Sequence, residues 1–185
     1  IVKQLIIMKK KTKKTKDISL LDIVPLELII LDFHAKDKND ALKQIANLFY
    51  EKNIVSDRDG FYENLEMRES IGSTACQEGV AFPYTISETN HDVIAGILIS
   101  REGIDFDDMW GGLTHIFLPK TGREERWKMD HNTYLYYLSR TSSLAKIKNF
   151  RDELMKAKSA DEVISSIKKG EEELLKRRNK GYVFE

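Results

Sequence analysis

The sequence predicts an α/β protein, a three-layer sandwich in which a mixed central sheet has helices on both faces. Short apolar runs without helical spacing alternate along the chain with segments whose apolar residues recur at helical intervals. Interleaved strands and helices favour a sheet covered by helices. The chain has 185 residues, of which 41% are hydrophobic. That size supports one domain with one core, plus tails.

The first predicted elements are a strand and two helices. Residues 26–33 are rich in Leu and Ile and predict a strand. Asp37, with Asp40 three residues later, is a helix-start signal. Ser56 with Asp59 repeats this signal, and an apolar face follows in both segments.

Arg68 occupies the position on the second helix that the spacing of Phe61 and Leu65 otherwise gives to the core. A buried guanidinium needs an anionic or a carbonyl partner. Two interpretations of Arg68 therefore stay open: it binds an anion, or it bridges helix to strand through carbonyl groups.

The second half of the chain predicts two strands followed by helices. Residues 93–99 and 113–118 are apolar runs without helical spacing. A helix is expected from His131 and another over residues 147–154. The spacing of Ser159 and Glu162 predicts a capping box at the start of the last helix, and a glycine, Gly170, is predicted to end it.

These elements divide the chain into three parts. Residues 1–17, with seven lysines, predict a basic flexible tail. Residues 18–170 predict the folded domain, and residues 171–185 predict a charged helical tail. The basic tail is expected to be a solubilising segment or a contact for nucleic acid or an anionic membrane.

Composition excludes several classes of function. Lys+Arg and Asp+Glu balance at 30 each, so nucleic acid is not expected along a whole face. The longest apolar runs, such as residues 28–31, fall far short of the roughly 20 residues of a membrane span. The single cysteine, Cys76, fits a reducing, cytoplasmic location. The spacing of histidines and acids predicts no metal site, and no cofactor is expected.

One phrase carries the strongest signal. Residues 65–84 read LEMRESIGSTACQEGVAFPY, a helix ending in Arg-Glu, then Gly-Ser-Thr, a short loop and Gly-Val-Ala-Phe-Pro-Tyr. Further on come the segment 103–107, a strand ending in Pro119, a histidine that opens a helix, and the run 154–162. This ordered series resembles the enzyme IIA domains, type 2, of the bacterial sugar phosphotransferase system, the mannitol/fructose and nitrogen-regulatory class. The resemblance covers roughly residues 18–167.

The resemblance implies a phosphoryl carrier. In the family, the histidine after Ala-[IF]-Pro accepts a phosphoryl group from a histidine-phosphorylated carrier protein, and an arginine and a second histidine surround that group. The matching positions here are Tyr84 for the acceptor, His131 for the second histidine, and Arg68, Ser73 and Thr74 for the anion-binding groups. These five residues are therefore expected to meet at one surface pocket. His131 alternatively makes only local hydrogen bonds at its helix start.

Tyr84 is the main departure from the family pattern. A phenol with a pKa of about 10 is mostly neutral at pH 7 and is a poor phosphoryl acceptor. The resemblance therefore implies a regulatory protein of the nitrogen-regulatory kind that does not carry phosphate. No IIB or IIC segment is attached in this sequence, which favours a stand-alone regulator. Its expected partners are a histidine-phosphorylated carrier protein or regulated target proteins.

Two alternatives remain open. The first is an active phosphoryl carrier that uses His131 as its acceptor. The second is a protein- or nucleic-acid-binding module that acts through the basic tail.

Overall fold

The computed structural model describes residues 19–76, 78–122 and 131–179, the side chains of 131–135 and 178–179 excepted. Two short 3₁₀ turns, Leu20–Asp22 and Leu26–Leu28, precede the first strand. The helices are α1 (Lys38–Glu51), α2 (Arg58–Ile71), α3 (His131–Ala145), α4 (Lys148–Lys156) and α5 (Ala160–Asn179). The strands are β1 (Ile29–Ile30), β2 (Ala75–Cys76), β3 (Val80–Ala81), β4 (Tyr84–Ile86), β5 (Ile94–Ala95), β6 (Ile97–Ile104), β7 (Thr114–Phe117) and β8 (Lys120–Gly122).

The strands form a mixed sheet of five and a smaller sheet of three. The larger sheet has the order β1-β6-β7-β3-β2, in which β1 is parallel to β6 and β3 is parallel to β7, while the other two pairs are antiparallel. In the smaller sheet β8 lies between β4, to which it is parallel, and β5, to which it is antiparallel. The predicted mixed sheet is confirmed.

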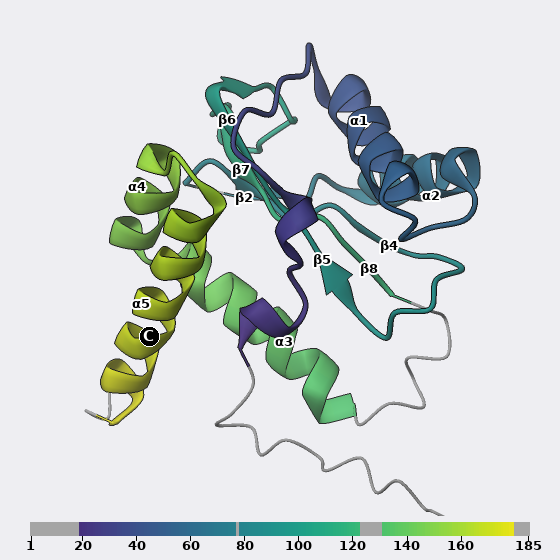
Figure 1. Ribbon diagram of the computed structural model, residues 1–185. Coiled ribbons are helices and arrows are strands. Elements are labelled where there is room, and N and C mark those ends of the chain that lie inside the picture. The colour runs from purple at the N-terminus through teal and green to yellow at the C-terminus, as the bar shows by residue number, and fades with distance from the viewer. Residues whose placement is uncertain (1–18, 77, 123–130, 180–185) are drawn as a thin grey trace, which may run out of the picture.

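Helices cover both faces of the sheet, so the predicted three-layer architecture is also confirmed. Helices α1 and α2 lie on one side of the strands and α4 and α5 on the other (Figure 1). Successive side chains of a strand point to opposite faces of the sheet. Each strand can therefore contribute residues to two hydrophobic cores, one on each face. In β6, Ile97 and Ile99 pack with α3, α4 and α5, whereas Leu98 packs with α1 and α2.

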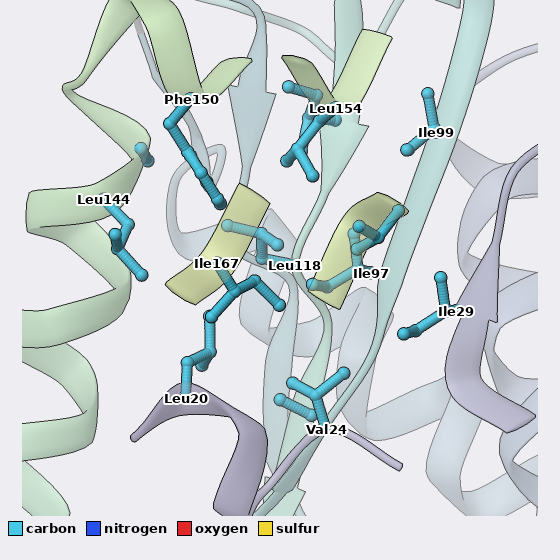
Figure 2. Packing of buried hydrophobic residues seen from close by; sticks show 14 of the residues in the cluster. Leu20, Val24, Ile29, Ile97, Ile99, Leu118, Leu144, Phe150, Leu154 and Ile167 are labelled. Carbon is cyan, nitrogen blue, oxygen red and sulfur yellow. The ribbon is translucent and has the colours of Figure 1, made fainter. Parts of the chain in front are cut away.

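The core on the α4–α5 side is drawn from distant parts of the chain. Figure 2 shows Leu20 and Val24 packing with Ile97 of β6 and with Leu144 and Ile167 of the C-terminal helices. The N-terminal 3₁₀ turn is also tied to α5 by hydrogen bonds. The Glu171 carboxylate accepts from the Ser19 hydroxyl and from the Leu20 N–H, both at 2.8 Å.

The helix starts are close to those predicted. Asp37 caps α1 by accepting from the N–H of Asp40 at 2.9 Å. Helix α2 is capped by Asp57, which accepts from the Gly60 N–H, so the predicted start at Ser56 is one residue early. The Ser159 hydroxyl accepts from the N–H of Glu162 at the start of α5.

The predicted helix end at Gly170 is wrong. Helix α5 continues through this residue to Asn179, and Gly170 is buried. A Cβ at position 170 would lie 2.7 Å from Leu144 Cδ2. The close approach of α5 to Leu144 of α3 therefore favours glycine here, and Gly170 does not mark a helix end. Glu171 and the partly buried Leu174 contact the domain beyond this point.

The predicted strands are shorter or divided. Within residues 26–33 only Ile29–Ile30 is extended, because a 3₁₀ turn occupies Leu26–Leu28. The run 93–99 contributes to both β5 and β6, which are separated by Gly96. Among the described residues, no helix is long and apolar enough to cross a membrane.

Candidate functional site

Tyr84 lies at the start of β4, beside two cationic side chains. The guanidinium carbon of Arg68, on α2, lies 4.7 Å from the centroid of the Tyr84 ring. The ammonium nitrogen of Lys120 lies 5.2 Å from the same centroid. Cations are attracted to the face of an aromatic ring by its quadrupole. The position that resembles the family's acceptor is therefore an aromatic ring in contact with two cationic side chains.

Lys120 is a site residue that the sequence analysis missed. It reaches Tyr84 because β4 and β8 are parallel neighbours, with Tyr84 and Lys120 as Cα partners. The two residues are separated by more than thirty positions in the sequence. A lysine directly after Pro119 at the end of an apolar run was the only available signal.

Arg68 does not face the core as the helical spacing predicted. It is partly buried, and the neighbouring residue Glu69 is the one that lies inside, 3% exposed. The Arg68 guanidinium donates to the Gly72 carbonyl at 3.0 Å. It forms no ion pair with a carboxylate within the described part of the chain. Its contacts thus combine a carbonyl with the Tyr84 ring.

The turn that was expected to hold an anion is filled by the carboxylate of Glu69. The Thr74 N–H donates to Glu69 Oε2 at 2.9 Å, and the Thr74 hydroxyl donates to Glu69 Oε1. The Ser73 hydroxyl donates to the Phe106 carbonyl at 2.8 Å and accepts from the Ala75 N–H. These hydrogen bonds hold the turn in place, and both hydroxyl hydrogens are already used within the protein.

A second carboxylate near the hairpin is also engaged. Glu78, in the turn between β2 and β3, pairs with Arg151 of α4, whose side chain is 10% exposed. Arg151 also donates to the carbonyl of Ala145 at 2.6 Å. This pair connects the β2–β3 hairpin to the helices on the other face of the sheet.

His131 begins α3, as predicted, but its side chain lies outside the described residues. Whether this imidazole meets Tyr84 therefore stays a prediction. Of the five residues expected at one pocket, Arg68 and Tyr84 are in contact, whereas Ser73 and Thr74 make their hydrogen bonds to Phe106 and Glu69.

A groove lies next to Tyr84 in the sequence and begins at Thr85. It has a volume of about 1230 Å³ and lies between the end of α1 with the α1–α2 connection, including Tyr50 and Ile54, and residues 85–90. Arg68, Tyr84 and Lys120 do not line it. The three residues are each partly buried.

The other candidate groups have structural contacts. His34 Nε2 is hydrogen-bonded to Asp32 Oδ1 at 2.8 Å. His115 Nδ1 is hydrogen-bonded to the Ser100 carbonyl oxygen at 3.1 Å. Burial raises the pKa of the Cys76 thiol, which is therefore a poor nucleophile. Among the described residues there is no group of three or more His, Cys, Asp or Glu side chains that would hold a metal ion.

Comparison with known proteins agrees with this fold. The solved structure of nitrogen regulatory protein IIA-Ntr from Neisseria meningitidis superposes with a TM-score of 0.66 and 25% identity, covering 79% of this chain and 97% of that one. IIA mannitol from Escherichia coli superposes with a TM-score of 0.62 at 16% identity, covering 77% and 97%. The second likeness concerns the fold alone.

Relatives by sequence include both sugar-specific and regulatory proteins. A fructose-specific EIIA component from Haloferax volcanii is 29% identical over 145 residues, which are 76% of this chain and 89% of the relative. A nitrogen regulatory protein from Pseudomonas aeruginosa is 28% identical over 128 residues, or 67% and 78%. A fructose-specific EIIABC component from Bacillus subtilis is 27% identical over 150 residues, which are 80% of this chain but only 23% of that protein.

The family model described as phosphoenolpyruvate-dependent sugar phosphotransferase system, EIIA 2, matches residues 22–170. The match includes the strands, both core layers and the Arg68–Tyr84–Lys120 cluster. This chain therefore belongs to the EIIA 2 family of the phosphoenolpyruvate-dependent sugar phosphotransferase system.

Proposed function

We propose that this protein is a regulatory EIIA 2 domain that binds partner proteins and does not carry a phosphoryl group. The observation that carries the proposal is the contact of the Tyr84 ring with Arg68 and Lys120, taken together with the resemblance, which implies that this phenol stands at the family's acceptor position. A neutral imidazole is a good nucleophile near pH 7, whereas a phenol of ordinary pKa is mostly protonated there. A phosphotyrosine, once formed, would also be a poor onward donor.

Anion binding belongs to the same proposal, although with a smaller set of residues than the resemblance implied. Arg68 has five N–H donors, of which one is given to the Gly72 carbonyl. Ser73 and Thr74 use their hydroxyl hydrogens internally and are expected to support the turn. His131 stays a candidate for the opposite side of the site.

The proposed partners are protein components of the phosphotransferase system and the targets that they regulate. The comparisons support both kinds of partner, regulated targets and components of the phosphotransferase system. One is a nitrogen regulatory protein, and an Escherichia coli mannitol IIA of the same fold was solved as a complex with phosphorylated enzyme IIB. A cytoplasmic location is proposed with this role, and cell fractionation would test it.

Phosphorylation in vitro tests the proposal. The protein is incubated with phosphoenolpyruvate, enzyme I and the histidine carrier protein, and its intact mass is measured without acid. No phosphoryl adduct is expected. An adduct on His131 would support the alternative in which the domain is an active carrier, and one on Tyr84 would equally overturn the proposal.

Tyr84→His provides the matched gain-of-function variant. If the acceptor is the only missing element, this variant gains a phosphoryl adduct under the same conditions. A folded but unlabelled variant would mean that the docking surface for the carrier has changed as well. The basic tail is tested separately, by deleting residues 1–17 and measuring salt-dependent retention on nucleic acid or anionic vesicles.

A further inference from the structure

We propose that the groove between the α1–α2 connection and residues 85–90 binds the chain's own lysine-rich segment, residues 9–16. The inference goes beyond the proposed function and holds whether or not the domain carries a phosphoryl group. It gives a role to two features that the proposed function leaves unused, the groove and the basic segment.

The size and the lining of the groove suit an extended peptide segment. Its volume of about 1230 Å³ exceeds the usual range of small-molecule sites, about 300–1,000 Å³. Serine and threonine hydroxyls line it together with the amides of Asn53, Asn64 and Asn90. Such groups form hydrogen bonds with backbone N–H and C=O groups, which an extended segment presents at every residue.

One side of the groove includes the edge strand of a sheet. Strand β4 is at the end of the three-stranded sheet, and its residues Thr85 and Ile86 line the groove. The Ser87 N–H donates to the Gly122 carbonyl, on the side of β8. Because backbone groups alternate in direction along a strand, Ile86 directs its N–H and C=O away from β8. A further extended segment adds to such an edge through main-chain hydrogen bonds.

The charges of the groove favour a cationic segment. Glu51 and Glu88 line it, both are exposed, and neither pairs with a cation within the described residues. Tyr50, 48% exposed, adds an aromatic ring whose face attracts cations. Of the described residues that line the groove, none is a lysine, an arginine or a histidine. Charge complementarity therefore favours lysine side chains and disfavours an anionic ligand.

The chain itself supplies a segment of this chemistry. Residues 9–16 contain six lysines. Residues 1–17 together have seven lysines and one aspartate, a net charge of +6, and because the whole chain is neutral the rest carries −6. The basic segment and the remainder of the chain are therefore opposite in charge.

The segment is close enough to reach the groove. The Ala95 N–H donates to the Ile23 carbonyl at 2.8 Å, which places the chain at Ile23 beside β5. From there β4 is three strand spacings away across the small sheet, or about 14 Å. Residues 9–18 span up to about 33 Å when extended. Single exposed ion pairs are weak, but a covalent connection of this length gives an effective concentration of about 1 mM.

Paramagnetic NMR on the full chain tests the contact. A nitroxide is attached at Thr12→Cys in a Cys76→Ser background, which leaves one cysteine to label. The amide signals of residues 53–56 and 85–90 should lose most of their intensity relative to a sample in which the nitroxide has been reduced. Signals of α4, on the other face of the sheet, should keep theirs (Figure 1).

Charge variants identify the cause of the loss. Glu51→Gln/Glu88→Gln should restore most of the intensity in both ranges. Asp161→Asn/Glu172→Gln removes two exposed carboxylates on α5 and is the matched control, which should leave the loss unchanged. Salt at about 1 M, where the Debye length is about 3 Å, should restore the signals as well. The positions of the unaffected amide signals show that each variant is folded.

An equal loss of intensity in α4 would overturn the inference, as would a loss that Glu51→Gln/Glu88→Gln retains. A mixed sample, in which isotope-labelled chains lack the nitroxide and unlabelled chains carry it, detects contacts between copies. Loss of the groove signals in that sample would assign the groove to the segment of a second copy and overturn the contact within one chain. A phosphoryl adduct in the mass measurement would overturn the proposed function and leave this result unchanged.

Discussion

The buried carboxylate of Glu69 accepts hydrogen bonds from both the backbone N–H and the side-chain hydroxyl of Thr74. This contact joins the last turn of α2 to the strand that begins at Ala75. It also places Arg68, one residue before Glu69, on the outer surface beside Tyr84. The hydrogen bonds between Glu69 and Thr74 therefore hold the end of α2 in place, and with it the position of Arg68 beside Tyr84.

Glu69→Gln should destabilise the protein. The amide keeps the size of the side chain but replaces one accepting oxygen with a donor that faces Thr74, so one charge-assisted hydrogen bond is lost. A loss of about 1–3 kcal/mol in the free energy of unfolding is expected. Urea denaturation measures it, with Glu66→Gln, at an exposed position on the same helix, as the control that should change little. Equal stability of both variants would mean that the Glu69–Thr74 contact contributes nothing.

Phosphate or sulfate should stabilise the wild-type protein more than chloride does at equal ionic strength. An anion present at about ten times its dissociation constant adds roughly 1.4 kcal/mol, or a rise of about 3 °C in Tm for a domain of this size. Thermal melts measure the increment.

The increment should disappear in Arg68→Met. It should survive in Lys43→Met, which removes a cation placed over Tyr62. An increment of the same size in all three proteins would reflect a general salt effect and would argue against an anion site at Arg68.

Stability should fall at high pH because of Tyr137. Burial, with a smaller contribution from Asp22, raises the pKa of Tyr137 to about 12. The unfolded chain loses this proton near pH 10, so its ionisation favours unfolding between about pH 10 and pH 12. The stabilising contribution is complete below pH 10 and is lost as the pH rises through that window.

Denaturation midpoints measured at about pH 9 and pH 11 test this expectation. Tyr137→Phe should show a smaller loss between the two pH values than the wild type, whereas Tyr50→Phe, at an exposed tyrosine, should behave like the wild type. An identical loss in Tyr137→Phe would place the pH sensitivity in other groups.

Gly170→Ala should destabilise the protein, although alanine is the better helix former. Helix propensity favours the change by about 1 kcal/mol, but overpacking a well-packed site costs about 1–3 kcal/mol. The new Cβ would lie 2.7 Å from Leu144 Cδ2 and 3.3 Å from Phe150 Cδ2. A net loss of about 1 kcal/mol is expected.

A double-mutant cycle identifies the cause. In a Leu144→Val background, which removes the contacting methyl group, Gly170→Ala should cost less than in the wild type. Additive effects of the two changes would show that the close approach of α5 to α3 does not set the cost.

Much of the fold was predictable because its signals are local. The helix starts at Asp37 and Ser159 follow from side chains that cap N–H groups three residues ahead. The apolar run at β7 and the helical pattern from His131 also lie close to their predicted positions. The two- and three-residue strands β2, β3, β4 and β8 were missed as strands, because such short segments carry no periodicity of their own.

The order of residues along the chain determined the fold class and the family, since each depends on local spacing or on a contiguous phrase. The place of Tyr84 at the acceptor position stays a prediction from that same phrase. Only the tertiary structure decided which groups surround that tyrosine. Lys120 reaches it through the pairing of β4 with β8, and the buried residue at the end of α2 is Glu69, with Arg68 outside. Gly170 likewise looks like a helix end in sequence and is a packing contact in space. Strand pairing and helix packing join residues far apart in the chain, and their geometry is absent from any local pattern.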